Sequence, residues 1–363
     1  MSRELLVVRG VRGMTLPELM VGLAVGLFVA TIAISTFVST RTLNVVNSSS
    51  TRMTENARLA TETLHTDLRS AGFAGCRTLE QRLDSPPLVV LAGGLDAGFI
   101  TEGNSGVRGF HGTGTAHSPA LPDVIDDLPV AYPKPLKDSD VISVRVPADT
   151  VAMGVVKSMA TTSAAPELAA SAPGNPIAKG DVVLIANCKA AAIFQVTSAN
   201  PAITGVLAHD TGELAPGNAS TDLKHVFRSD ATVYRMQTRH YYVAPSAQRP
   251  GTNSLWRLAV PGPAGTAPVP EEIAASVDRL RVMFGVDTDA IADLSVNRYL
   301  KASDVTDWDR VLSARVQLVA ATAEDRMAVS KQSYKLDTGV QTASDNRLRT
   351  VLTEVVTLRN AAP

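Results

Sequence analysis

An uncharged apolar run near the start of the chain, residues 19–38, constrains the fold more than any other feature. At a helical rise of about 1.5 Å per residue, a run of this length can cross the roughly 30 Å hydrocarbon core of a membrane. One acid, Glu18, directly precedes it, and a short leader ends at Gly13. A secretory signal places its cleavage site after its apolar run. Here the junction between Gly13 and Met14 lies before the run, so cleavage there would leave the apolar helix on the mature protein.

The charge of the chain bears on its topology and its partners. The formal net charge is −1 over 363 residues, with no long basic run, so a nucleic-acid partner has no support from charge. The leader carries Arg3, Arg9 and Arg12 against Glu4. Basic residues flanking an apolar span stay in the cytoplasm, so the sequence predicts a cytoplasmic leader and an exported remainder, long enough to bury a sizeable core.

A helical pattern continues beyond the apolar run. Small or apolar residues recur at three- and four-residue steps, and Gly72 offers a C-terminal stop. A helix over residues 16–71 would be about 84 Å long. The alternative is a membrane span and a separate amphipathic helix joined near residues 47–51, because residues 48–51, Ser-Ser-Ser-Thr, are a poor helix interior. The residues between these recurring positions, including Glu62, Asp67 and Arg69, are predicted to face water. The recurring residues form an apolar stripe that consists of Leu43, Val46, Ser50, Met53, Ala57, Ala60, Leu64, Leu68 and Ala71.

The rest of the chain reads as β-structure. Residues 92–122 are rich in Gly, His and Pro and predict a long irregular excursion. Strands in series with no regular helix between them then favour an antiparallel sheet, with the helical stripe packed on one face. The predicted strands are residues 141–146, 182–185, 193–197, 203–207, 226–243, 254–260, 280–286, 311–320 and 350–358, separated by turns at 160–180, 245–253 and 261–270.

The chain has two cysteines, Cys76 and Cys188. In an exported chain a disulfide is favoured over two free buried thiols. The bridge would close a loop of about 110 residues, and loop-closure entropy for such a loop corresponds to about 4–5 kcal/mol of stabilisation before strain. It would join the segment after the long helix to the middle of the head.

The junction resembles a type IV prepilin. Residues 13–21 read Gly-Met-Thr-Leu-Pro-Glu-Leu-Met-Val and lead into the apolar run. Met14 replaces the more common phenylalanine, and Pro17 lies in the first helical turn, where it removes an amide that has no partner in any case. Four further patches resemble PilW-type minor pilins: residues 54–76, residues 180–197, residues 285–299 and residues 349–360.

The resemblance implies an α+β type IV pilin fold. By this resemblance the chain divides into a leader (1–13), a spine helix with a membrane half and an amphipathic half (14–72) and a β-rich periplasmic head (73–363). The resemblance also implies cleavage after Gly13 by a prepilin peptidase and methylation of the Met14 amine. The chain is then a substrate and no enzyme. As a minor pilin it would prime pilus assembly with other minor pilins and the major pilin, at or near the tip. It would lie first in the inner membrane, among its lipids, and then in the pilus at the cell surface.

Glu18 has two interpretations. A carboxylate within an inserted helix costs a few kcal/mol unless it is paired. The resemblance implies that Glu18 pairs with the positive N-terminus of a neighbouring pilin as subunits leave the membrane. The alternative is an acid at headgroup level that is favoured by the helix dipole.

Other candidate sites are weaker. Asp287, Asp289 and Asp293 resemble a calcium loop but lack its glycine and have Ile291 at a ligand position, so a polar turn is predicted. Residues 109–115 are glycine-rich without a P-loop lysine. The histidines, at 65, 111, 117, 209, 225 and 240, show no metal-ligand spacing. We therefore expect no metal, no cofactor and no catalytic set.

Three alternatives to a minor pilin stay open. A type II secretion pseudopilin shares the leader, the helix and the fold. A tip-located adhesin or ligand-binding module would use the loops at 92–122 and 160–180 as its binding surface. The third, a membrane-tethered periplasmic enzyme, has no recognisable catalytic motif to support it.

Overall fold

The computed structural model describes residues 13–77, 85–94, 98–101, 105–169, 176–212, 214–262, 266–289, 291 and 293–361. Of the predicted leader, residues 1–12 lie outside this set. The chain divides into two compact units, Met1–Thr51 and Arg52–Pro363, which we describe separately.

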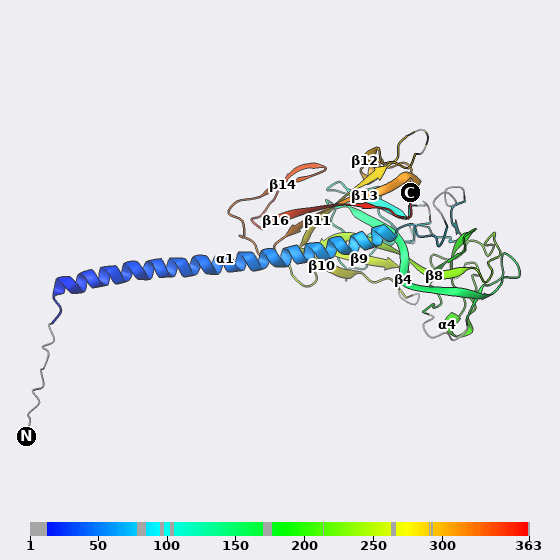
Figure 1. Ribbon diagram of the computed structural model, residues 1–363, viewed down its shortest axis with the longest axis horizontal. Helices are drawn as coiled ribbons and strands as arrows, with labels where there is room; N and C mark the ends of the chain where they lie inside the picture. The colour runs from blue at the N-terminus through cyan, green and yellow to red at the C-terminus, as the bar shows by residue number, and fades with distance from the viewer. Residues whose placement is uncertain are drawn as a thin grey trace, which may run out of the picture. The chain divides into compact units, whose positions relative to one another are not determined.

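The N-terminal helix is a single element, α1 (Leu16–Ser70), and the alternative with a break near residues 47–51 is wrong (Figure 1). The hydroxyls of Ser48 and Thr51 donate to the carbonyls of Val45 and Asn47 along the same helix. A hydroxyl satisfied in this way can stay inside a helix instead of competing with its backbone bonds. By length and composition α1 includes a segment able to cross a membrane, and none of that segment is buried by protein.

After the last turns of α1, most of the regular elements described in the second unit are strands. The long strands are β4 (Val141–Lys157), β8 (Thr232–Pro245), β11 (Val277–Val286) and β13 (Val311–Ala321). The others are β1 (Leu88–Val89), β2 (Val107–Gly112), β3 (His117–Ser118), β5 (Glu167–Leu168), β6 (Val182–Ala186), β7 (Ala191–Gln195), β9 (Asn253–Val260), β10 (Glu271–Ala275), β12 (Arg298–Leu300), β14 (Ser333–Leu336), β15 (Gly339–Thr342) and β16 (Arg349–Thr357). Among the described residues, the short helices α3 (Asp123–Asp126), α4 (Pro201–Thr204), η2 (Ala302–Asp304) and η3 (Trp308–Arg310) lie in the connections.

The described strands form three sheets. The largest has the order β1-β7-β6-β8-β4-β2-β3, with β9 and β10 added beside β8 and β5 beside β4. Its central strand, β8, pairs with β4 along one side and with β6 and then β9 along the other. A four-stranded antiparallel sheet has the order β12-β11-β13-β16, and β14 and β15 form a hairpin.

Consecutive strands link the two larger sheets. The chain leaves the large sheet at the end of β10 and enters the four-stranded sheet at the start of β11, with one residue, Ser276, between them. Ser276 has a φ of +65°, which turns the chain sharply at this point. The two sheets therefore follow from one continuous stretch of sequence.

The last turns of α1 share one hydrophobic core with both sheets. Ala60, Leu64 and Leu68 of the helix lie in the same buried cluster as Val144 of β4 and Leu318 of β13. Figure 1 shows this end of α1 with β11, β13 and β16 on one side and β9 and β10 on the other. The stripe from Met53 to Ala71 is buried as predicted. An α+β architecture with a long N-terminal helix is thus confirmed.

Three expectations about the β-structure are wrong in detail. Residues 203–207 are no strand: Pro201 starts the short helix α4, and Gly205 ends it in a left-handed conformation. Residues 92–122 are no continuous excursion, because β2 lies within them and pairs with β4. The large sheet is also mixed, since β1 and β7 run parallel.

The end of α1 is capped by the C-terminal segment of the chain. Gly72, with a φ of +68°, ends the helix, and its amide donates to the carbonyl of Arg145 at 3.2 Å. The Asn360 side-chain amide donates to the carbonyl of Ala71 at 2.9 Å. Carbonyls that a helix leaves without partners are satisfied here by a residue far away in the sequence.

The buried stripe of α1 predicts the response to side-chain truncation. Leu64 is 1% exposed in the shared core, so Leu64→Ala should lower the free energy of unfolding by about 2–5 kcal/mol. Leu59, on the same helix, is 50% exposed, and Leu59→Ala should change it by less than about 0.5 kcal/mol. Denaturant unfolding of the full chain in detergent measures both, and equal effects would contradict this packing.

Candidate functional site

The prepilin-like junction begins α1 with a capping box. Thr15, the residue before the helix, donates its backbone amide and its hydroxyl to Oε2 of Glu18, each at 2.9 Å. The Leu19 amide donates to the Thr15 carbonyl at 3.1 Å. A glutamate three residues after the cap residue that accepts the amide of that residue makes one half of a capping box. Glu18 therefore has a local role that the sequence interpretation did not include.

The residues around the junction leave the backbone accessible. A side chain built on Gly13 would meet no atom within 4 Å, and residues 13–19 are exposed. Pro17 lies in the first turn of α1, where its missing amide removes no helical hydrogen bond. The backbone on both sides of the predicted cleavage point is therefore free of steric cover within the described residues.

The structure joins Cys76 to Cys188 in a disulfide, with their Cα atoms 5.2 Å apart. The bridge ties the turn after α1 to the end of β6. A close approach beside it needs glycine: a Cβ on Gly75, whose φ is +76°, would lie 2.7 Å from Cβ of Ala186. The segment that follows the helix is thereby fixed to the large sheet.

Asp67 lies on the buried side of α1, and the prediction for this residue is wrong. The sequence pattern placed it toward water, but it is 5% exposed. Its carboxylate pairs with Nη1 of Arg239 at 2.7 Å and accepts the hydroxyl of Tyr241 at 2.5 Å. Burial, with the nearby Asp67 charge, raises the pKa of Tyr241, so this phenol stays protonated and can donate. A buried carboxylate is stable here because both a charge and a hydroxyl satisfy it.

A second buried carboxylate, Asp140, links the two larger sheets. It accepts hydrogen bonds from the amide of Gly112 at the end of β2 and from the amide of Val282 in β11. Nη1 of Arg281 lies 2.6 Å from Oδ1 of Asp140, and Nδ1 of His111 lies 2.9 Å from it. Burial alone would raise the pKa of Asp140, but the His111 hydrogen bond, the Arg281 charge and the two amides hold it below its usual value.

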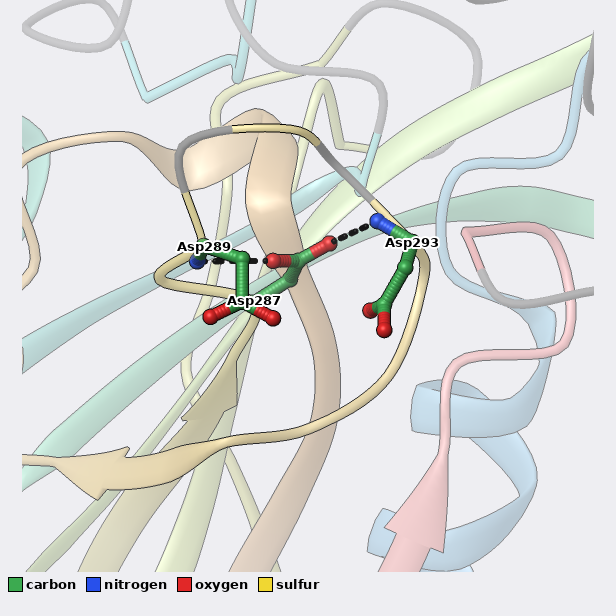
Figure 2. A group of neighbouring side chains, drawn as sticks. All are labelled: Asp287, Asp289 and Asp293. Carbon is green, nitrogen blue, oxygen red and sulfur yellow. Dashed lines mark hydrogen bonds between the residues drawn. The ribbon is translucent and has the colours of Figure 1, made fainter.

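The acidic group after β11 is organised by its own backbone. Figure 2 shows Asp287, Asp289 and Asp293, the one described group of three possible ligands whose atoms lie within 4.8 Å of one another. The Asp287 carboxylate accepts the amides of Asp289, Asp293 and Leu294 at 3.0–3.1 Å. Hydrogen bonds from the hydroxyl and the amide of Ser295 lower the pKa of Asp293. These contacts build the polar turn that the sequence predicts.

A serine and a histidine are paired in the interior of the large sheet. Nδ1 of His240 lies 2.6 Å from the Ser143 hydroxyl, and Nε2 lies 2.9 Å from the carbonyl of Gly98. Because that carbonyl can only accept, Nε2 carries the proton and the serine donates to Nδ1. Both side chains are fully buried, and burial lowers the pKa of His240 to about 4. The pair joins β4 to β8 and has no access to a substrate.

His240 predicts a pH-dependence of stability. Its pKa is about 4 in the folded chain and 6.5 for a histidine exposed to water, so the unfolded chain binds the proton more tightly. Stability should fall as pH decreases from about 7 to 4, by up to about 3 kcal/mol from this residue, at 1.36 kcal/mol per pKa unit. His240→Gln should flatten this slope in denaturant titrations at a series of pH values.

The matched control for that prediction is Ser143→Ala. It keeps the imidazole buried and removes only its hydroxyl partner, so it should retain the slope of the unmodified chain. An unchanged slope in His240→Gln would contradict the assignment.

The comparisons with known proteins bear on the C-terminal third of the chain. Residues 240–360 match the model of the family described as type IV pilus-assembly protein W, PilW. The match runs from β8 to the residue that caps α1. No curated protein and no solved structure matches the chain. The matched range excludes the leader and the apolar run, so it supports the PilW assignment independently of them, and the predicted resemblance to this family is confirmed.

Proposed function

We propose that this chain, assigned to the PilW family by residues 240–360, is a minor pilin of a type IV pilus. In this proposal it has the pilin fold, with α1 as the spine helix and the β-rich unit as the head. A prepilin peptidase removes residues 1–13, and the amine of Met14 is methylated. The subunit passes once through the inner membrane with its head in the periplasm, and then enters the pilus with other minor pilins, at or near the tip.

The observation that carries this proposal is the single helix α1. It begins three residues after Gly13, contains an uncharged apolar segment, and ends in the core of the head. Cleavage behind the apolar segment, as in a secreted protein, would remove about two fifths of a helix whose last turns are packed between sheets. Cleavage at Gly13 keeps the helix whole. Cleavage behind the apolar segment would cut a helix that the fold keeps continuous, so the prepilin interpretation is favoured.

Glu18 acts in assembly in this proposal. Its carboxylate is held at the start of α1 by Thr15, close in sequence to the amine that cleavage creates at Met14. In the apolar environment of a helix bundle, a carboxylate needs a positive partner. The Met14 amine of a neighbouring subunit supplies that charge. The pairing would draw subunits into register as they leave the membrane.

The head contributes contacts and no catalysis in this proposal. The Ser143–His240 pair is buried, and the acidic turn at Asp287 is satisfied by its own amides. A minor pilin needs a rigid surface, and the head is made rigid by the Cys76–Cys188 disulfide and by the buried carboxylates Asp67 and Asp140. Such a head can meet other subunits and prime the first layer of a pilus.

Variants of Glu18 separate its two roles. Glu18→Gln keeps a capping-box side chain but loses the charge, whereas Glu18→Leu loses both. If the charge pairs subunits, both variants should reduce the subunit recovered in sheared pili at least about tenfold, as expected for loss of one charged partner in an apolar site. The measurement is the ratio of subunit in the pilus fraction to subunit in the membrane fraction.

Met20→Leu, a change within the apolar run that preserves its volume, serves as the control and should assemble normally. Normal assembly of Glu18→Gln with failure of Glu18→Leu would assign Glu18 to helix capping alone. Normal assembly of both would overturn the assembly role.

A further inference from the structure

A cavity of about 680 Å³ lies at the end of α1 in the second unit. It is lined by the last turn of the helix, the segment at Phe73 and Gly75 beside the disulfide, the strands β4 and β8, and the C-terminal residues Arg359 and Asn360. A second cavity of about 560 Å³ shares Ala148 and Arg239 with it and extends along β8 and β9. Volumes of this size are typical of ligand sites.

The walls of the two cavities carry five arginines, and three of these are matched with carboxylates. Arg239 pairs with Asp67 at 2.7 Å, and Arg257 pairs with Glu271 at 2.7 Å. Arg235 lies 3.4 Å from Asp149. The charges of these three arginines are therefore already balanced within the chain.

The remaining two arginines are Arg69, in the last turn of α1, and Arg359, after β16. Both side chains are exposed, and no hydrogen bond or ion pair joins either guanidinium to the described part of the chain. The carboxylates in the walls are used by the other three arginines. The first cavity therefore presents two guanidinium groups whose charge the protein itself does not balance.

The rest of the first cavity is suited to polypeptide. Phe73 and Tyr234 form an edge-to-face pair with centroids 4.9 Å apart, which supplies an apolar surface. The β4–β8 register shifts between Pro147 and Ala152, so the backbone between them leaves the regular ladder at the wall of the cavity. Residues that depart from a ladder lose their cross-strand partners, and here the Ala148 carbonyl already accepts Nη2 of Arg239 at 3.0 Å.

We propose that this cavity binds an acidic peptide segment of a protein partner, with two of its carboxylates paired to Arg69 and Arg359. Arginine presents a planar fork that can match a carboxylate with two hydrogen bonds. In the same cavity, Arg239 already pairs with the Asp67 carboxylate through Nη1. An apolar side chain of the segment packs on Phe73 and Tyr234. The site goes beyond the proposed function and does not depend on it, because it is built from residues of the second unit alone.

The test uses the full chain in detergent at low ionic strength, with two peptides blocked at both ends. One alternates glutamate with serine around a central phenylalanine, and the other has glutamine in place of glutamate. The chain should bind the glutamate peptide at least about tenfold more tightly than the glutamine peptide, since charge-assisted hydrogen bonds contribute on this scale. Arg69→Gln combined with Arg359→Gln should remove that difference, as measured by calorimetry.

The matched control combines Arg58→Gln with Arg298→Gln, two exposed arginines outside both cavities, and should keep the affinity within about twofold. The melting temperature of each variant checks folding, and Arg359→Gln alone serves if the pair unfolds. Equal weakening in the control, no binding by the unmodified chain, or full competition by inorganic phosphate at the peptide concentration would each overturn the proposal. Phosphate competition would assign the cavity to small anions.

Discussion

The structure depends on the burial of one stripe of α1 in a core that two β-sheets share. Ala57, Ala60 and Ala71 are small enough to let strands approach the helix, while Leu64 and Leu68 fill the space between. Burial of such a stripe, and not helix propensity, supplies most of the stability of a helix in a protein. In this cluster the four-stranded sheet packs against the helix, the large sheet and the segment that contains Trp308. Loss of the helix would expose the buried faces of both sheets.

Polar contacts then fix the position of that helix. Asp67 pairs with Arg239, Asn360 caps the last carbonyls, and the disulfide at Cys76 holds the turn that follows. Breaking one partner of a buried ion pair costs about 3–5 kcal/mol, which is comparable to removing a core leucine. These contacts come from β8, β6 and the C-terminal residues. Segments that are distant in the sequence therefore fix the position of the end of the helix together. The cavity with its unmatched arginines, Arg69 and Arg359, lies at that convergence.

Local patterns in the sequence predict the helix and most of the long strands. The stripe from Met53 to Ala71 follows from three- and four-residue spacing, and β9, β11, β13 and β16 follow from alternation. Asp67 could not be placed, because its burial depends on Arg239 and Tyr241, which the chain brings to it from far away. Residues 203–207 do not form the expected strand, because a proline begins a short helix there and a glycine ends it. The cavity is also beyond sequence reasoning, since its walls come from five separate segments. The capping role of Glu18, in contrast, was readable from Thr15 three residues earlier.

The account therefore rests on a helix that is kept whole, with its apolar segment and its buried stripe on one mature chain. Mass spectrometry of the protein purified from a host that has a prepilin peptidase tests this most directly. The account predicts a mature N-terminus at Met14, carrying one methyl group on its amine. An N-terminus behind the apolar run, or an intact Met1, would contradict it.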